Sequence, residues 1–412
     1  MKSTLGVSRS VIARAALGAL VSTFLIGTAA AQQMAAVEWQ QRFDSAPSNV
    51  EMPGTSVPLL SPETLQATQA ALVKYQELEA RGGWQGVPSG PALKLGSKNP
   101  NVGLLRQRLV ISGDLSANVG DSNVFDSYVD AAVRRFQARH GLIVTGIVGP
   151  DTLQAMNVPV SVRVQQLQVN IDRLRKLTAS AQPHRYVMVN IPGAHAEAVE
   201  DGVVELRHNV VVGKADRESP ELSVKILAVN FNPYWTVPAS IIKKDLIPKM
   251  QAQPDYLTKN HIRIYDQHGQ ELQPEQIDWH SDEAMNYRFT QDPGDFNSMG
   301  SVRINMANKD GVYMHDTPSK GLFGENNRFH SSGCVRVQNV HQLVRWLLKD
   351  TPGWDSAHVD AALSSGDRID APLAQPVPVK WVYITGWAGA DGVVQFREDI
   401  YNKDGLGQLA AR

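Results

Sequence analysis

The residues of this chain that could do covalent chemistry lie close together in its second half. Cys334 is the only cysteine among 412 residues, it follows Gly333, and His315 lies nineteen positions before it. A thiol that can form no intramolecular disulfide is an unreactive packing residue, an intermolecular disulfide partner, a metal ligand or a nucleophile. The preceding glycine and the upstream histidine favour the nucleophile.

A cysteine nucleophile needs neighbours that generate thiolate. A neutral thiol has a pKa near ~8.5 and reacts slowly, so a base or a positive field must assist it. His315 is the predicted base, because residues 312–315 (VYMH) have the pattern of a strand and Pro318 ends it. Glycine allows close backbone approach, so the N–H groups of Gly333 and Cys334 are the predicted oxyanion hole.

Three other roles for Cys334 remain open at this level. Its polar neighbours Ser331, Ser332 and Arg336 argue against a buried, inert thiol. A zinc site would use His315, His330 and Cys334, but their spacing fits no common zinc template, so no metal site is predicted. A covalent link between two chains is neither supported nor excluded.

The elements that must position these residues are mostly strands. Alternating apolar residues predict strands at 186–191, 203–206, 209–213 and 224–231, within a mainly β catalytic domain over 183–372. Leucines and valines at helical spacing predict an amphipathic helix over 340–349. A polar insert at about 240–299, starting with a helix at 241–250, is a lid or substrate wall, or else a surface elaboration. Residues 373–412 are predicted to add strands to this domain.

The N-terminal half has helical patterns. Apolar residues recur at helical spacing over 62–82 and 161–178, so segments 61–92 and 158–182 are predicted to pack as one scaffold. Between them, residues 93–157 form a small helical module, in which Val133, Phe136 and Leu142 are predicted core. Residues 32–60 mix Gln, Pro, Ser and Ala without periodicity and are predicted to be a flexible arm.

The first 31 residues predict export. Lys2, Arg9 and Arg14 precede an apolar run, and the segment ends in Ala-Ala-Ala, which is typical of a cleaved signal peptide. An uncleaved membrane anchor is the alternative, and membrane contact is expected only in that case. The chain has 40 basic and 41 acidic residues, so cleavage would leave a net charge of about −4. Nucleic acid is therefore not an expected partner.

Two resemblances rest on longer motifs. Residues 132–142 (AVRRFQARHGL) and the following glycine turn resemble the peptidoglycan-binding type 1 domain. The motifs YMHDTP and SSGCVR around His315 and Cys334 resemble the L,D-transpeptidase family with a YkuD-type catalytic domain, in its larger periplasmic branch with a scaffold and a wall-binding insert. Further matches are VVGK at 211–214, NFNPYWTVP at 230–238 and QDPG at 291–294. Many family members have histidine where this chain has Ser332, and His330 does not replace it.

The resemblance implies acyl transfer on peptidoglycan stem peptides in the periplasm, without a cofactor. Cys334 would form a thioester with the third stem residue and release D-alanine, and a neighbouring stem amine would take the acyl group. Tyr313, Ser331, Ser332 and Arg336 are the substrate-binding candidates. Alternatives are a cysteine carboxypeptidase or endopeptidase, a non-catalytic wall-binding protein, or a zinc amidase, for which no convincing ligand set is found. The fold expected is multidomain α+β, with a helical scaffold, a small α-helical insert and a mostly β catalytic domain bearing a lid-like insert.

Overall fold

The computed structural model describes residues 55–406. The predicted signal peptide and most of the predicted arm lie outside this range. Within it, no helix combines the length and apolar character needed to cross a membrane.

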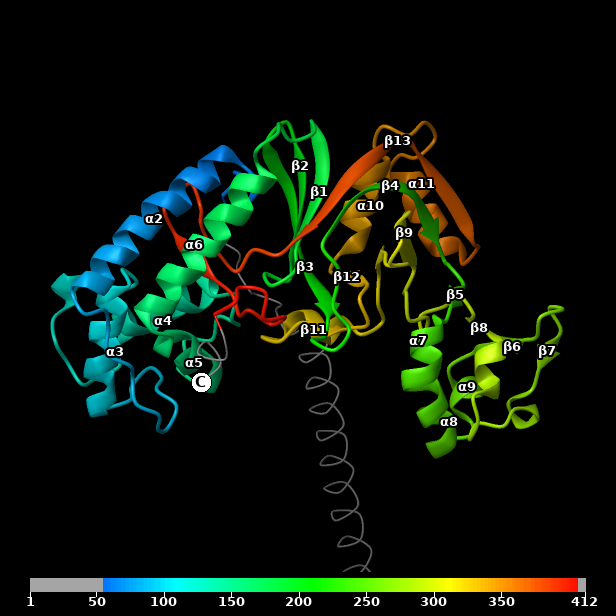
Figure 1. Cartoon of the computed structure of the whole chain (residues 1–412), viewed down its shortest axis with the longest axis horizontal. Helices are drawn as coiled ribbons and strands as arrows, with labels where there is room; N and C mark the ends of the chain where they lie inside the picture. Colours follow the sequence, from blue (N-terminus) through cyan, green and yellow to red (C-terminus); the bar gives the residue numbers. More distant parts are fainter. Residues whose placement is uncertain (1–54, 407–412) are drawn as a thin grey trace, which may run out of the picture. The chain divides into compact units, whose positions relative to one another are not determined.

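Two long helices of the N-terminal half pack side by side (Figure 1). The first begins where Ser61 accepts a hydrogen bond from the Thr64 N–H and proline occupies the first turn. Tyr75 of this helix and Leu167 of the other share a hydrophobic cluster. These are α2 (Pro62–Ala80) and α6 (Val160–Leu177), and the predicted helical scaffold is confirmed.

Three shorter helices between them form a module with its own core. Asp126 caps the middle helix, and Val133 and Phe136 of that helix are fully buried, as predicted for core residues. Leu142, which was also predicted to be core, lies just beyond the end of this helix and is only partly buried. The helices are α3 (Pro100–Ile111), α4 (Ser127–Arg139) and α5 (Pro150–Asn157), with the 3-10 turn η1 (Ala117–Val119) after α3.

The second half folds into a closed sheet. Eight strands follow the order β3-β12-β10-β9-β4-β13-β1-β2, and pairing between β2 and β3 closes the ring, while β11 pairs with the C-terminal end of β3, beyond β2. The ring strands are β1 (Arg185–Asn190), β2 (His195–Glu200), β3 (Val203–Gly213), β4 (Leu222–Phe231), β9 (Val302–Met306), β10 (Met314–His315), β12 (Val335–Val337) and β13 (Ile369–Val382), and β11 spans Phe329–Ser331. The mostly β catalytic domain is thus confirmed.

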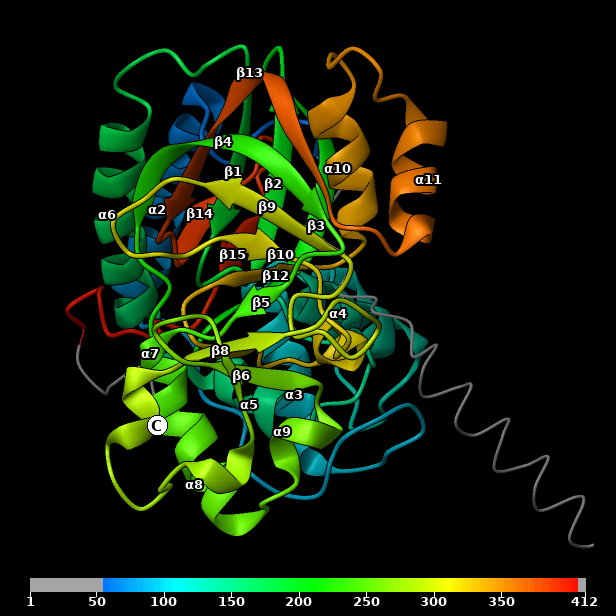
Figure 2. The ribbon, with the colours of Figure 1, turned by 90° about the vertical axis from the view of Figure 1, so that its right-hand side faces the viewer.

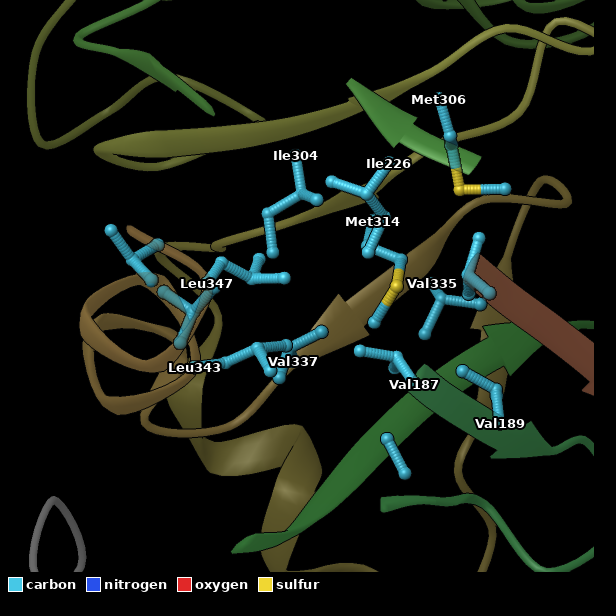
Figure 3. Packing of buried hydrophobic residues seen from close by; sticks show 14 of the residues in the cluster. Val187, Val189, Ile226, Ile304, Met306, Met314, Val335, Val337, Leu343 and Leu347 are labelled. Atoms are coloured by element: carbon cyan, nitrogen blue, oxygen red, sulfur yellow. The ribbon is translucent and has the colours of Figure 1, made fainter. Parts of the chain in front are cut away.

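Side chains that alternate inward fill the barrel (Figure 3). Met314, Val335 and Ile304 come from neighbouring strands, and each is completely buried. Leu343 and Leu347 of α10 cover one side of this core. The helices here are α10 (Val340–Leu348), as the apolar spacing predicted, and α11 (Ser356–Ser365). Because inward positions are apolar, the residues between them face outward.

The insert between β4 and β9 is a compact subdomain, which we call the cap (residues 235–291). It was predicted to be polar, but it has its own hydrophobic core, which includes Leu246, Ile264 and Phe289. A four-stranded sheet in the order β5-β8-β6-β7 faces the barrel strands (Figure 2). Its elements are β5 (Trp235–Thr236), α7 (Ala239–Ile241), η2 (Ile242–Leu246), α8 (Ile247–Ala252), α9 (Tyr256–Lys259), β6 (Ile262–Tyr265), β7 (Glu271–Leu272), η3 (Pro274–Gln276), η4 (Glu283–Asn286) and β8 (Arg288–Gln291).

Two expectations need correction at the ends of the described chain. Residues 55–60, placed in the flexible arm, are packed: Leu59 and Leu60 are buried, and the Leu59 N–H donates to the Glu197 carboxylate at 3.0 Å. Residues 373–412 were expected to add strands to the catalytic domain, and the part up to Val382 does so as the end of β13. The last two strands instead form a separate hairpin against α2 and α6, where Phe396 packs with Tyr75. These strands are β14 (Gly386–Ala388) and β15 (Val394–Phe396).

Candidate active site

The strand register brings the two central residues to one face of the barrel. Strands β10 and β12 are parallel neighbours, with Met314 opposite Val335 and His315 opposite Arg336. The Val335 N–H donates to the Tyr313 carbonyl at 3.0 Å, so Cys334, which directly precedes β12, lies beside Tyr313. Since Met314 and Val335 point into the core, Tyr313, His315 and Cys334 all lie on the opposite face.

Tyr313 lies next to the sulfur atom of Cys334. Burial raises the thiol pKa, while the nearby phenol and backbone of Tyr313 and the charges of Arg303 and Arg336 oppose that rise. Burial also raises the phenol pKa of Tyr313 far above its ordinary value. The indole of Trp235 in the cap opposes the rise in the phenol pKa of Tyr313. The resting site therefore holds a neutral thiol next to a neutral phenol.

His315 is a buried, neutral base. Its side chain is 6 % exposed, and burial together with the charge of Arg336 lowers its pKa to about 3. Its Nδ1 has no hydrogen-bond partner among the described residues. The ring of Tyr313 packs edge-on against the imidazole, with centroids 5.5 Å apart. An uncharged imidazole on the same face as the thiol can accept its proton.

The loop before Cys334 is held by its own side chains. Ser331 is buried, its hydroxyl donates to the Cys334 carbonyl, and it accepts the Gly333 N–H at 3.2 Å. The predicted oxyanion role of Gly333 is therefore not supported, because its N–H is already engaged. The Cys334 N–H has no acceptor in the described part of the chain and remains the available donor.

Gly333 is instead required by the backbone conformation of this loop. Its φ of +112° is a region that side chains rarely adopt, and an added Cβ would lie 3.3 Å from the Glu218 carbonyl. The turn at Gly333, directly before Cys334, therefore requires glycine.

Ser332 links the catalytic loop to the cap. It is exposed, and its hydroxyl accepts from the Arg217 guanidinium at 3.0 Å. The same guanidinium forms an ion pair with Asp245 of η2 in the cap. This pairing raises the pKa of Arg217. Ser332 thus lies where cap and loop meet, and Arg217 joins them.

Arg336 lies beside the thiol without a carboxylate partner within residues 55–406. Its Nε is buried and unpaired, and burial lowers the pKa of its guanidinium. Arg303 on β9 pairs with His315 across the strands, and its guanidinium lies over the Tyr313 ring at 4.7 Å. Two positive charges therefore flank the face that carries Cys334 and His315.

Two nearby polar residues are engaged elsewhere. The Asp316 carboxylate accepts from the Ser301 N–H at 3.1 Å and pairs with Lys320, so it does not orient His315. His330 is exposed, and its Nε2 lies 2.9 Å from the Glu325 carboxylate. Among residues 55–406, no group of three His, Cys, Asp or Glu side chains is arranged to hold a metal ion.

The α3–α5 module contacts the segment that leads into the Cys334 loop. Asn326, eight positions before Cys334, accepts the Ile143 N–H at 2.6 Å and donates to the Asp151 carboxylate at 2.6 Å. Ile143 directly follows the HGL motif, and Asp151 lies in the first turn of α5. The module thus braces the segment that leads into the catalytic loop.

Family models match both halves of the chain. Residues 98–156 match the "Putative peptidoglycan binding domain", and residues 184–355 match the L,D-transpeptidase catalytic domain called YkuD. The second match contains both His315 and Cys334. Residues 184–355 form a YkuD-type L,D-transpeptidase domain. The wall-binding resemblance of the α3–α5 module and the family of the catalytic domain are both confirmed.

One curated relative and several solved structures are similar to the chain. A "Putative L,D-transpeptidase" of Haemophilus influenzae is 38% identical over 241 residues, which cover 58% of this chain and 48% of the relative. The chain thus spans about half the length of this relative.

The solved structures are more distant. An L,D-transpeptidase from Xylanimonas cellulosilytica is 17% identical, with 72% of this chain and 99% of that chain covered and a TM-score of 0.24. One from Stackebrandtia nassauensis is 13% identical, with 72% and 96% covered and a TM-score of 0.26. Global superpositions this poor add nothing to the family assignment.

Three residues of the candidate site were not singled out from the sequence. Trp235 lies within the NPYWTVP motif, which was noted without a role for the indole. Arg303 sits between the buried Val302 and Ile304, so its outward position could have been read from alternation. No sequence signal marks Arg217, since its partners come from the cap and from the Cys334 loop.

Proposed function

We propose that this protein is a peptidoglycan L,D-transpeptidase that works through a Cys334 thioester and forms cross-links between third stem residues. The observation that carries the proposal is the register of β10 and β12, which sets Cys334 and His315 on one outward face of a YkuD-type domain. The attached peptidoglycan-binding domain supports the wall as substrate.

The first half-reaction forms the thioester. Sulfur of Cys334 attacks the carbonyl carbon of the third stem residue, a diamino acid, while His315 takes the thiol proton. The carbonyl oxygen becomes an oxyanion, and the Cys334 N–H donates to it. The carbon–nitrogen bond to the terminal D-alanine then breaks, and His315 returns the proton to the leaving amine.

The second half-reaction transfers the acyl group. An amine of a neighbouring stem attacks the thioester, His315 takes a proton from that amine, and the carbon–sulfur bond breaks. The departing sulfur recovers the proton, which restores a neutral thiol and a neutral imidazole. No cofactor enters either step.

Binding groups around the thiol have separate roles in this proposal. Tyr313 stabilises the developing thiolate, since its phenol and backbone act to lower the thiol pKa. Arg336 binds a stem carboxylate, because a guanidinium without a protein carboxylate partner is suited to a carboxylate ligand. Ser331 holds the loop, and Ser332 with Arg217 connects it to the cap.

The periplasm is the proposed location, on the strength of the N-terminal leader. The peptidoglycan-binding domain would keep the enzyme at the wall, and Asn326 would hold the module against the loop that precedes Cys334.

Product analysis tests the function. Wall tetrapeptide monomers and dimers are incubated with the wild-type protein and with Cys334→Ala, and the products are identified by mass spectrometry. The proposal predicts diamino-acid to diamino-acid cross-links that vanish in the variant. Shortened stems without cross-links would show a carboxypeptidase that uses the same cysteine, and activity surviving Cys334→Ala would overturn both.

A further inference from the structure

A cavity of about 560 Å³ lies between the barrel and the cap. One wall is the outward face of β4, β9 and β13, which contributes Asn230, Arg303 and Asp370. The other wall is the cap sheet, which contributes Tyr265 and Arg288. Its volume falls within the range of about 300–1,000 Å³ that is usual for ligand sites.

Strand alternation makes both walls polar. On β8, Phe289 is buried in the cap core, so Arg288 and Thr290 point into the cavity. On β9, Val302 and Ile304 fill the barrel, so Arg303 points into the cavity. The two strands therefore present one arginine each from opposite sides.

The charges that line the cavity do not balance. Arg263 donates to Asp292 at 2.8 Å, and Arg368 donates to Asp370 at 3.3 Å, so both carboxylates are already paired. The other two arginines of the cavity, Arg288 and Arg303, have no acidic partner among residues 55–406. The cavity thus holds two uncompensated positive charges, one on the cap and one on the barrel.

Both of these guanidinium groups are held in place by aromatic rings. Arg288 lies over Tyr265 at 4.8 Å, and Arg303 lies over Tyr313 at 4.7 Å. The Nε of Arg303 is buried and has no hydrogen-bond partner in the described part of the chain. One N–H of Arg303 donates to the Asn305 side-chain oxygen at 3.4 Å, and stacking leaves the remaining donors of both groups for a ligand.

We propose that this cavity is a second carboxylate-binding subsite, in which Arg288 of the cap and Arg303 of the barrel together bind a free carboxylate of a stem peptide. The inference rests on the proposed function, and it adds a site that does not contain Cys334, His315 or Arg336. Carboxylates and guanidinium groups form paired, charge-assisted hydrogen bonds, and stem peptides carry more than one free carboxylate.

The subsite is connected to the nucleophile by direct contacts. Arg303 stacks on Tyr313, and Tyr313 lies next to the sulfur of Cys334 and acts to lower its pKa. A stem anchored between the two arginines is therefore separated from the thiol by two side-chain contacts. The carboxylate belongs either to the donor stem, away from its scissile bond, or to the acceptor stem, and the experiment below separates these sources.

The test combines Arg288→Gln with amidated stem peptides. Acylation by donor tetrapeptide alone, and transfer to added acceptor, are followed separately by intact-protein and product mass spectrometry. Loss of one charge-assisted contact should raise KM roughly tenfold for the stem that is bound here, while kcat falls much less. Amidating the bound carboxylate should weaken the wild type by at least a similar factor and cost Arg288→Gln less, because only the Arg303 contact is left to lose.

Control variants distinguish loss of the Arg288 contact from a general effect of lost charge or of unfolding. Lys243→Gln removes a cap charge outside the cavity, where the side chain is 62% exposed, and it should change neither step. Arg288→Lys keeps the charge and should recover part of the loss. The subsite is wrong if amidation and Arg288→Gln act independently on KM for every carboxylate of both stems, or if neither changes KM. If the two changes overlap in the acylation step, the bound carboxylate belongs to the donor stem. If they overlap only in the transfer step, it belongs to the acceptor stem.

A binding measurement that involves no reaction tests the subsite separately from the proposed function. Calorimetry with Cys334→Ser measures stem tetrapeptide affinity without reaction. If the wild type forms no thioester, the proposed function fails, yet affinity that drops roughly tenfold in the Cys334→Ser, Arg288→Gln double variant still supports the subsite. Equal affinity in both variants overturns it.

Discussion

The protonation state of Cys334 gives a quantitative prediction. Burial raises the thiol pKa, and His315, whose pKa is lowered to about 3, cannot supply a cationic partner near neutral pH. Alkylation by iodoacetamide should therefore rise about tenfold for each pH unit from 6 to 8.5, without a plateau. Because the chain has a single cysteine, intact-protein mass reports this site alone.

Tyr313→Phe sharpens the test. The phenol acts to lower the thiol pKa, and a hydrogen bond to the charged thiolate would contribute about 1.5–3 kcal/mol, which corresponds to roughly one to two pKa units. The variant should have a still higher thiol pKa and react about tenfold more slowly at pH 7.5. Tyr128→Phe, at an exposed position in α4, is the matched control. A plateau near pH 7 in the wild type would mean a resting thiolate–imidazolium pair and would refute this reasoning.

Three further predictions concern the loop, the module and acid stability. Gly333→Ala should destabilise the fold by about 1–3 kcal/mol in chemical unfolding and slow acylation, because alanine is strained at φ +112°; unchanged stability would contradict that assignment. Asn326→Ala should speed amide hydrogen exchange at Ile143, whose N–H it accepts, and unaltered exchange would show that the contact is not formed in solution. His208 is buried with its pKa lowered to about 4, so only the unfolded state gains its proton between pH 6.5 and 4, and stability falls as pH falls. His208→Gln should reduce that slope by about 1.4 kcal/mol per pH unit in unfolding experiments, and an equal slope would argue against a buried neutral imidazole.

Much of the barrel was predictable because its strands alternate clearly. The segments 186–191 and 224–231 match β1 and β4 closely. The strand β2 was missed, since its sequence HAEAVE is rich in Ala and Glu, which have low β-propensity, and only pairing with β1 and β3 makes it a strand. The predicted break at 207–208 inside β3 was wrong for the same reason, because Arg207 and His208 pair with β2.

The site shows a similar division between local and long-range information. Local motifs identified Cys334 and His315, but their common face follows from pairing between strands nineteen residues apart in sequence. The engagement of the Gly333 N–H by Ser331 depends on the conformation of the loop, and residue types alone do not reveal it. The cap core was hidden because its apolar residues are spread over short helices and strands among many polar positions.

The most direct test of the central claim is the mass of the intact protein after rapid quenching with a stem tetrapeptide. The account predicts that the wild type gains the mass of the tetrapeptide less D-alanine, on Cys334. Cys334→Ser should gain no such adduct, and His315→Gln should form it at a rate lower by about two to four orders of magnitude. An adduct that forms at the wild-type rate in His315→Gln, or that maps to a residue other than Cys334, would contradict the account.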